Sequence, residues 1–103
     1  MVQNLNEGQF EAVMRRKKPA VIEFSALWCA PCRVLEPVFK ELSKEITEAD
    51  FYTVDVDRES RLAERFSVMS LPTIVILKDG EEIARIHGFS NKEHLMASIM
   101  AKI

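Results

Sequence analysis

The stretch from Ala20 to Val56 most constrains what this chain can fold into, because its apolar residues change period twice. AVIEFSAL (Ala20–Leu27) is short, rich in β-branched and aromatic residues and apolar on both sides of the pleat, which predicts a central buried strand. From Pro31 onward, apolar residues recur at helical spacing and predict a long amphipathic helix. These residues are Val34, Leu35, Val38, Phe39, Leu42 and Ile46. FYTVDV (Phe51–Val56) is predicted as a second strand, so the stretch forms a βαβ unit with parallel strands and a right-handed crossover.

Helical signals also lie on both sides of this unit. Asn6, with Gln9 three residues later, predicts an N-terminal cap followed by a helix over about Glu7 to Arg16. A short helix is predicted over Arg58–Phe66, directly after the second strand. We therefore expect one helix before the βαβ unit and another directly after it.

The C-terminal part predicts a hairpin and a last helix. TIVILKDGEEIARI (Thr73–Ile86) gives two strands joined at Asp79–Gly80, a strong two-residue hairpin signal, so this half of the sheet should be antiparallel. Ser90, with Glu93 three residues later, predicts the cap of a final helix. Its buried stripe is predicted to be Leu95, Met96, Ile99 and Met100. We expect an α/β protein with helices on both faces of a mixed sheet, in a single domain over residues 1–103.

Composition and charge disfavour several classes of partner. Of the 103 residues, 48% are hydrophobic and 29% are charged, and the net charge of -2 is too small for a nucleic-acid-binding surface. No apolar run reaches the roughly 18 residues that span a bilayer, and the first residues lack the basic and apolar segments of a secretory leader. We therefore expect a cytoplasmic monomer that contacts neither nucleic acid nor membrane.

Both cysteines of the chain, Cys29 and Cys32, lie in the motif WCAPC. A pair at this spacing can be half of a zinc site, a structural crosslink or a redox centre. A chain of this length does not need a crosslink, and a reducing compartment disfavours one. Zinc would need two more ligands, and His87 and His94 are spaced outside the usual finger pattern, so we expect no metal. The pair is therefore predicted to be a redox-active dithiol.

The predicted start of the long helix assigns different roles to the two cysteines. Cys29 lies at or just before the first turn, where free backbone N–H groups and the helix dipole stabilise a thiolate. Cys32 lies one turn further in, with less of this field and more burial, so the pKa of its thiol should stay higher. Pro31 fits the first turn, because its missing N–H would be unpaired there anyway. We predict that Cys29 attacks a substrate disulfide and that Cys32 resolves the mixed disulfide.

Glu23 and Trp28 each leave two interpretations open. Glu23 is the ionisable residue of the predicted central strand, and a buried carboxyl there would have a raised pKa and could exchange a proton with Cys32. The alternative is a Glu23 side chain that reaches solvent or a lysine at the sheet edge. Trp28 is interpreted as a half-exposed docking surface beside the dithiol, and the alternative is a packed core tryptophan. The burial of the two side chains decides between these alternatives.

The segment VIEFSALWCAPCRVLEP (Val21–Pro37) resembles the active-site strand, loop and helix of the thioredoxin family. The resemblance extends from about Phe10 to Ile99 and includes VDVDRE and SLPTIVILKDGEEIARIHGFS. It implies the thioredoxin fold, with a mixed five-stranded sheet flanked by four helices. It also implies a protein-disulfide reductase that maintains cell redox homeostasis without a bound cofactor, acts on disulfide-containing proteins and receives electrons from thioredoxin reductase. Two alternatives stay open: a disulfide oxidase or isomerase of the same fold, and a thioredoxin-like binding module whose dithiol is incidental.

The resemblance also implies which residues form the site. It places the catalytic pair at Cys29 and Cys32 and makes Pro72 the cis-proline that faces them. Family substrates lie as an extended strand over the positions that match Trp28, Ala30, Pro31, Leu71 and Gly88. From the sequence alone, the alternative for Pro72 is a loop proline that ends a helix, and the alternative for Gly88 is a turn at a strand end.

Six positions depart from the family pattern: Ser25, Ser67 and Ser70, and the three that bear most directly on the dithiol, Ala30, Glu23 and Thr53. Ala30 stands where glycine is common between the cysteines, which should change the flexibility of the loop. Glu23 replaces the family's buried aspartate, and Thr53 replaces the lysine that usually accompanies it. Without that positive partner, the pKa of a buried Glu23 carboxyl should be raised further.

Overall fold

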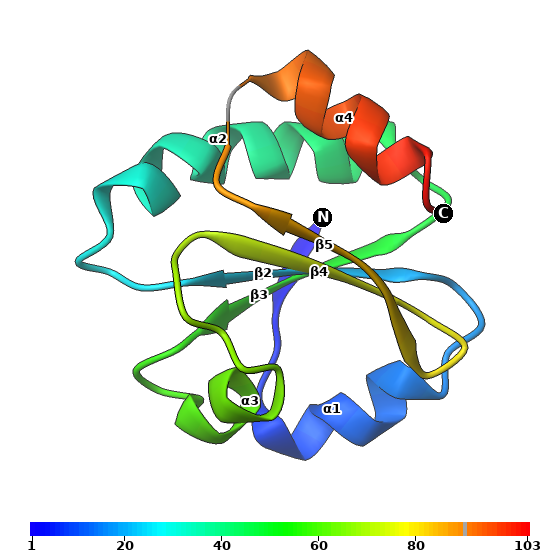
Figure 1. Ribbon diagram of the computed structural model, residues 1–103. Helices are drawn as coiled ribbons and strands as arrows, with labels where there is room; N and C mark the ends of the chain where they lie inside the picture. The colour runs from blue at the N-terminus through cyan, green and yellow to red at the C-terminus, as the bar shows by residue number, and fades with distance from the viewer. Residues whose placement is uncertain (90) are drawn as a thin grey trace.

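The computed structural model describes residues 1–89 and 91–103, which contain a five-stranded mixed sheet (Figure 1). Its strands are β1 (Val2–Asn4), β2 (Ala20–Ser25), β3 (Asp50–Asp55), β4 (Thr73–Lys78) and β5 (Glu81–His87). They lie in the order β1-β3-β2-β4-β5, with β1, β3 and β2 parallel to one another and β4 antiparallel to both β2 and β5. The predicted parallel unit and antiparallel C-terminal hairpin are therefore confirmed.

Four helices in the described residues cover the two faces of the sheet. They are α1 (Glu7–Met14), α2 (Ala30–Glu45), α3 (Ser60–Arg65) and α4 (Lys92–Met100). The helices α1 and α3 lie on one face, and α2 and α4 lie on the other (Figure 1). Each pair packs its own hydrophobic core, with Phe10 and Leu62 in one and Phe39 and Ile99 in the other. Within the described residues, no helix is long and apolar enough to cross a membrane.

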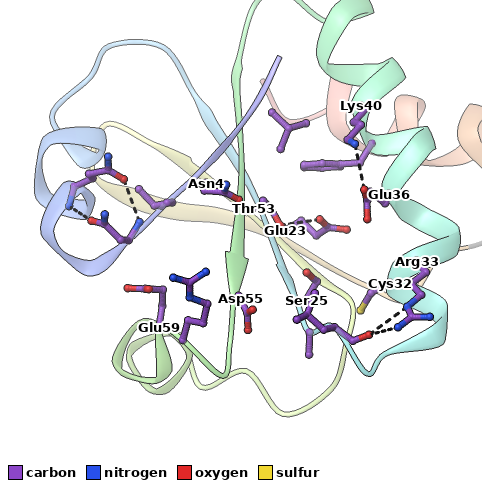
Figure 2. A pocket seen from close by; sticks show the side chains of 18 residues that line it. Asn4, Glu23, Ser25, Cys32, Arg33, Glu36, Lys40, Thr53, Asp55 and Glu59 are labelled. Carbon is purple, nitrogen blue, oxygen red and sulfur yellow. Dashed lines mark hydrogen bonds and ion pairs between the residues drawn. The ribbon is translucent and has the colours of Figure 1, made fainter.

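The strand β2 is buried on both faces, as its continuous apolar sequence predicts. Val21 belongs to the core under α2 and α4, and Ile22 to the core under α1 and α3. Because side chains alternate across a strand, Glu23 points to the same face as Val21, toward α2 (Figure 2). A buried carboxyl therefore lies beneath the helix that carries Cys32.

Two local signals have the predicted geometry. The Asn6 side chain accepts a hydrogen bond of 2.9 Å from the Gln9 N–H, and the Gln9 side chain accepts one of 3.2 Å from the Asn6 N–H. This reciprocal box satisfies backbone donors at the start of α1 that would otherwise lack partners. In the hairpin between β4 and β5, Asp79 and Gly80 have φ values of 53° and 78°. Both are positive, as a two-residue turn that follows the twist of its strands requires.

Three predicted boundaries are wrong by two residues. The helix α1 ends at Met14 rather than Arg16, β2 ends at Ser25 rather than Leu27, and α3 begins at Ser60 rather than Arg58. At the end of β2, the N–H of Cys29 donates to the carbonyl of Ala26 over 3.2 Å. This turn takes Leu27 out of the strand and brings the chain to the start of α2 within a few residues.

Two residues of the predicted apolar stripes face solvent instead. Val34 is 63% exposed, because it precedes the fully buried Leu35 and one residue turns a helix face by about 100°. Met100 is 41% exposed, because it follows the buried Ile99 and one residue turns a helix face by about 100°. The cap of α4 also differs: Asn91 is the N-cap and accepts a bond from the N–H of His94, whereas Ser90 lies outside the described residues.

Candidate active site

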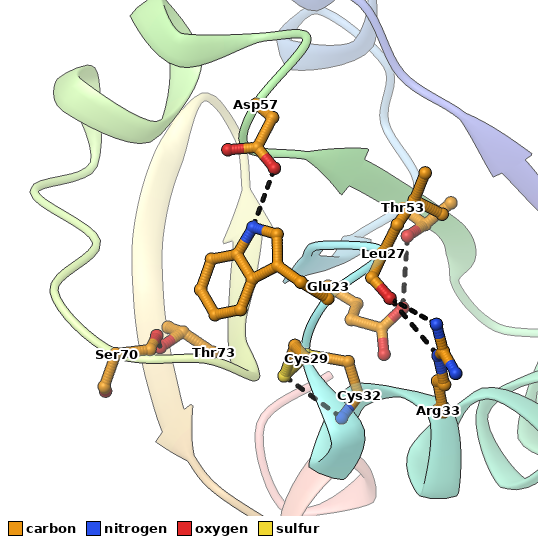
Figure 3. Close-up of a disulfide and its surroundings, with 10 residues drawn as sticks. Glu23, Leu27, Cys29, Cys32, Arg33, Thr53, Asp57, Ser70 and Thr73 are labelled. Carbon is orange, nitrogen blue, oxygen red and sulfur yellow. Dashed lines mark hydrogen bonds between the residues drawn. A yellow bond between two sulfur atoms is a disulfide. The ribbon is translucent and has the colours of Figure 1, made fainter.

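Cys29 and Cys32 form a disulfide at the N-terminus of α2 (Figure 3). Their Cα atoms are 5.3 Å apart, and both residues are buried. Cys29 is the N-cap of the helix, and its Sγ accepts a hydrogen bond of 3.3 Å from the backbone N–H of Cys32. The first turn thus brings the two sulfurs together and directs a backbone donor at the Cys29 sulfur. That donor and the positive end of the helix dipole favour a thiolate at Cys29 once the disulfide is reduced.

Segments from distant parts of the chain meet beside the dithiol. Leu71 packs against a small cluster formed by Ala26 and the two cysteines. The peptide bond between Leu71 and Pro72 is cis, and the N–H of Gly88 donates to the carbonyl of Pro72 over 3.1 Å. Pro72 does not end a helix, since α3 stops at Arg65. Pro72 therefore links Leu71, which packs against the cysteines, to Gly88 at the end of β5.

The residues next to the cysteines in the chain are exposed. Trp28 is 70% exposed, which rules out the packed core alternative. Its indole N–H donates to Oδ2 of Asp57 over 2.8 Å, and this bond fixes the orientation of the ring (Figure 3). Ala30 and Pro31 are also exposed, in the first turn of α2 between the cysteines. No sequence pattern pointed to Asp57, because an aspartate in a loop is ordinary and its partner Trp28 lies 29 residues away along the chain.

Glu23 is only 4% exposed, so the alternative in which it reaches solvent or a lysine is wrong. Its Oε1 accepts a bond of 3.1 Å from the hydroxyl of Thr53 on β3, and its Oε2 has no hydrogen-bond partner within the described residues. Burial raises the pKa of Glu23 from 4.5 to about 7. The Thr53 bond opposes this rise, and the negative charge of Glu36 adds to it. A carboxyl with this pKa can both take up and release a proton near neutral pH.

A groove of about 840 Å³ lies between α2 and the sheet, behind the dithiol (Figure 2). Glu23 and Cys32 line it, whereas Cys29 and Trp28 are not among its described lining residues. The charged residues that line it are Arg33, Glu36, Lys40, Asp55, Arg58 and Glu59, together with Glu23. Cys32 and the buried carboxyl therefore open to this groove, whereas the exposed tryptophan is not among the described residues that line it. Sequence reasoning missed Glu36 and Lys40, although their spacing of four on one helix is a recognisable pair signal.

Both histidines line a second, smaller cavity with Gly88, and neither cysteine is among the described residues that line it. His87 is exposed at the end of β5, with Nδ1 3.4 Å from the hydroxyl of Thr73. Within residues 1–89 and 91–103, no three His, Cys, Asp or Glu side chains gather as a metal site requires.

Comparison with known proteins gives a consistent result. The family model described as thioredoxin matches residues 1–101. A thioredoxin H-type protein of Fagopyrum esculentum is 42% identical over 98 residues, which cover 95% of this chain and 83% of that protein. Thioredoxin-1 of Saccharomyces cerevisiae is 34% identical over 81 residues, which cover 79% of each chain. The X-ray structure of Fasciola hepatica thioredoxin superposes with a TM-score of 0.90 and 35% sequence identity, covering 98% of this chain and 99% of that one.

Proposed function

Because the chain belongs to the thioredoxin family and is a thiol–disulfide oxidoreductase that reduces protein disulfides, we propose a role for each cysteine in that reaction. Cys29 is the nucleophile and Cys32 is the resolving cysteine. The observation that carries this assignment is the hydrogen bond from the Cys32 N–H to Cys29 Sγ at the start of α2. It supports a thiolate at the first cysteine, whereas Cys32 lies one turn further along the helix.

The reaction then balances as two successive exchanges. The Cys29 thiolate attacks one sulfur of a substrate disulfide, whose bond breaks and whose second sulfur leaves as a thiolate that takes a proton from water. Glu23 takes the proton of the Cys32 thiol, directly or through water in the groove that both residues line. The Cys32 thiolate attacks Cys29 Sγ, the mixed disulfide breaks, and the reduced substrate leaves. Two electrons have passed to the substrate, and the enzyme holds the Cys29–Cys32 disulfide.

The substrate is proposed to dock as an extended strand along a rim beside the sulfurs. This rim consists of Trp28, Ala30, Pro31, Leu71 and Gly88. Three observations support it: the exposed indole is held in place by Asp57, Leu71 packs against the cysteines, and no atom lies within 4 Å of where a Cβ of Gly88 would be. Pro72 is proposed to hold the loop in position, through its carbonyl bond with the N–H of Gly88. An extended peptide gains main-chain hydrogen bonds on such a surface.

The electron donor and the setting are part of the same proposal. Thioredoxin reductase supplies the electrons that return the disulfide to a dithiol, and the substrates are proteins with accessible disulfides. The protein acts as a monomer with a single domain over residues 1–103. A cytoplasmic location fits this chemistry, because a dithiol reductase needs a compartment that keeps it reduced.

Insulin reduction tests the proposal. Wild-type protein should reduce insulin with NADPH and thioredoxin reductase, and also with dithiothreitol alone as the reductant. Cys29→Ser should abolish both activities, whereas Cys32→Ser should trap partner proteins as mixed disulfides through Cys29. Absence of insulin reduction with either reductant refutes the proposed function, and trapping by the Cys29→Ser variant instead would reverse the assigned order. A measured equilibrium redox potential in the range of disulfide oxidants would favour the oxidase alternative.

A further inference from the structure

The groove behind the dithiol holds a charged pair that the reaction described above does not use. Glu36 and Lys40 lie one turn apart on α2 and line this groove together with Glu23 and Cys32 (Figure 2). Lys40 Nζ lies 3.1 Å from Glu36 Oε1, so the two side chains form an ion pair. Glu23 lies below them on β2, with Oε2 buried and without a hydrogen-bond partner among the described residues. A buried carboxyl with a free oxygen beside two opposite charges is sensitive to the balance between them.

We propose that Glu36, held by Lys40, is a positioning residue of the dithiol reaction that controls, across the groove, whether the Glu23 carboxyl carries a proton. The proposal rests on the proposed function, in which Glu23 takes the proton of Cys32. Glu36 is not assigned a contact with the sulfurs or the substrate in this proposal. It acts through Glu23 alone, by making that carboxyl a stronger base for the resolving step.

The other charges around the groove belong to Arg33 on α2, Asp55 on β3, and Arg58 and Glu59 before α3. Three of these four side chains are held by bonds to the backbone. The Arg33 guanidinium donates to a backbone carbonyl, and Asp55 and Glu59 each accept a backbone N–H. Glu36 is instead paired with Lys40, and both side chains are exposed. The Glu36–Lys40 balance can therefore be changed in either direction by one substitution, without disturbing a turn or a cap.

The sign of the effect follows from the charges. The negative charge of Glu36 disfavours a second negative charge on Glu23, so it raises the pKa of Glu23 in addition to the effect of burial. Lys40 offsets part of that charge. Removal of the Glu36 charge should therefore lower the pKa of Glu23, and removal of the Lys40 charge should raise it. A general loosening of the fold would not produce opposite shifts from two neighbouring residues.

Glu36→Gln and Lys40→Gln test the proposal in the oxidised protein, where the cysteines do not titrate. The readout is the titration of the Glu23 carboxyl by carbon-13 NMR. Its midpoint should fall by about 0.5 pH unit in Glu36→Gln and rise by a similar amount in Lys40→Gln, since exposed charges act through a high effective dielectric. Both shifts should shrink at about 1 M salt, where the screening length is about 3 Å. Glu41→Gln is the matched control, because Glu41 lies on the same helix but pairs with Lys92, away from the groove.

The pH dependence of insulin reduction supplies a second readout. In each variant, the part of the pH–rate profile that changes near neutral pH should shift in the same direction as the Glu23 titration. In a Glu23→Gln background, Glu36→Gln should leave this part of the profile unchanged. The proposal is overturned if the titration midpoint of Glu23 is unchanged in both variants, or shifts in the same direction in both. The proposed function is then still supported if the wild-type protein reduces insulin. A midpoint that shifts without any change in the pH profile overturns the link to the reaction, and it locates the failure in the assigned role of Glu23.

Discussion

Glu23→Gln tests how one buried carboxyl makes the stability of the fold depend on pH. Glu23 is 4% exposed, and its burial raises its pKa from 4.5 to about 7. In the unfolded chain the same carboxyl titrates near its ordinary value, so between these two pH values the folded state keeps a proton that the unfolded state has lost. The raised pKa therefore contributes stability that is fully present below about pH 4.5 and is lost as the pH rises through about 7.

The magnitude follows from the same two values. A rise in pKa from 4.5 to about 7 corresponds to about 3 kcal/mol, at about 1.4 kcal/mol for each pH unit. That is a large fraction of the free energy of unfolding of a small domain, which is typically about 5–15 kcal/mol. Glutamine keeps the shape of the side chain and can still accept the Thr53 hydroxyl, but it has no proton to lose. The variant should therefore escape the cost of a buried carboxylate above neutral pH.

The assay is urea unfolding of the oxidised wild-type and Glu23→Gln proteins over a series of pH values. The free energy of unfolding of the variant, minus that of the wild type, should grow by about 3 kcal/mol between about pH 4.5 and about pH 8. Both histidines and the disulfide are common to the two proteins, so their contributions cancel. A difference that stays constant across this range would refute the argument that desolvation governs this carboxyl.

Three further substitutions test other contacts. Thr53→Val removes the hydrogen bond that favours the charged form of Glu23, so the pKa of that carboxyl should rise in an NMR titration, and a fall would contradict the assigned direction. Asp57→Ala frees the Trp28 indole, so its fluorescence should change and the KM for insulin should rise about threefold with kcat unchanged. An unchanged KM would show that the orientation of the ring is unimportant for docking. Asn6→Ala removes the cap of α1 and should lower the free energy of unfolding, measured in urea, by about 1 kcal/mol. An unchanged urea midpoint would mean that water pairs with the backbone N–H groups at the start of this helix equally well.

The features that could be predicted from the sequence depend on neighbouring residues. The buried strand β2 is an uninterrupted apolar run, and the hairpin is specified by Asp79 and Gly80, which can adopt positive φ. The position of Cys29 at the start of α2 follows from the onset of helical periodicity together with Pro31 in the first turn. Each of these signals acts within one or two turns of chain, which is the range over which propensity and local hydrogen bonding operate.

The edge strand β1 could not be predicted in this way. Its three residues, VQN, lack an alternating pattern, and two of the three are exposed. The strand forms because Val2 pairs with Phe51 and Asn4 with Thr53, so its partner lies almost half the chain away. An edge strand that is short and polar needs no apolar signature of its own, and its stability comes from the ladder that it joins.

The same limit applies to two features of the active site. The bond between Trp28 and Asp57 depends on how two loops meet, and the approach of Glu36 to Glu23 depends on the rotation of α2 about its axis. Periodicity predicted the buried face of α2 correctly at Leu35 and Phe39, but it assigned Val34 to that face wrongly. A single residue step turns a helix by about 100°, so a small error in the stripe changes which side chains face the groove.

Thr53 is a neutral partner of Glu23 at the position where a lysine is usual in the family, and this difference has a chemical consequence for the whole site. A hydroxyl donor favours the carboxylate form of Glu23, but burial outweighs it, and the pKa of Glu23 lies at about 7. A proton acceptor is most effective when its pKa is near the working pH, because it is then largely available and still a strong base. A cation in place of Thr53 would lower the pKa of Glu23, so the carboxylate would be abundant but a weaker base toward Cys32. With a neutral partner at position 53, the pKa of Glu23 is instead adjusted by the charges on α2. There, the opposite charges of Glu36 and Lys40 line the groove and have opposite effects on that pKa.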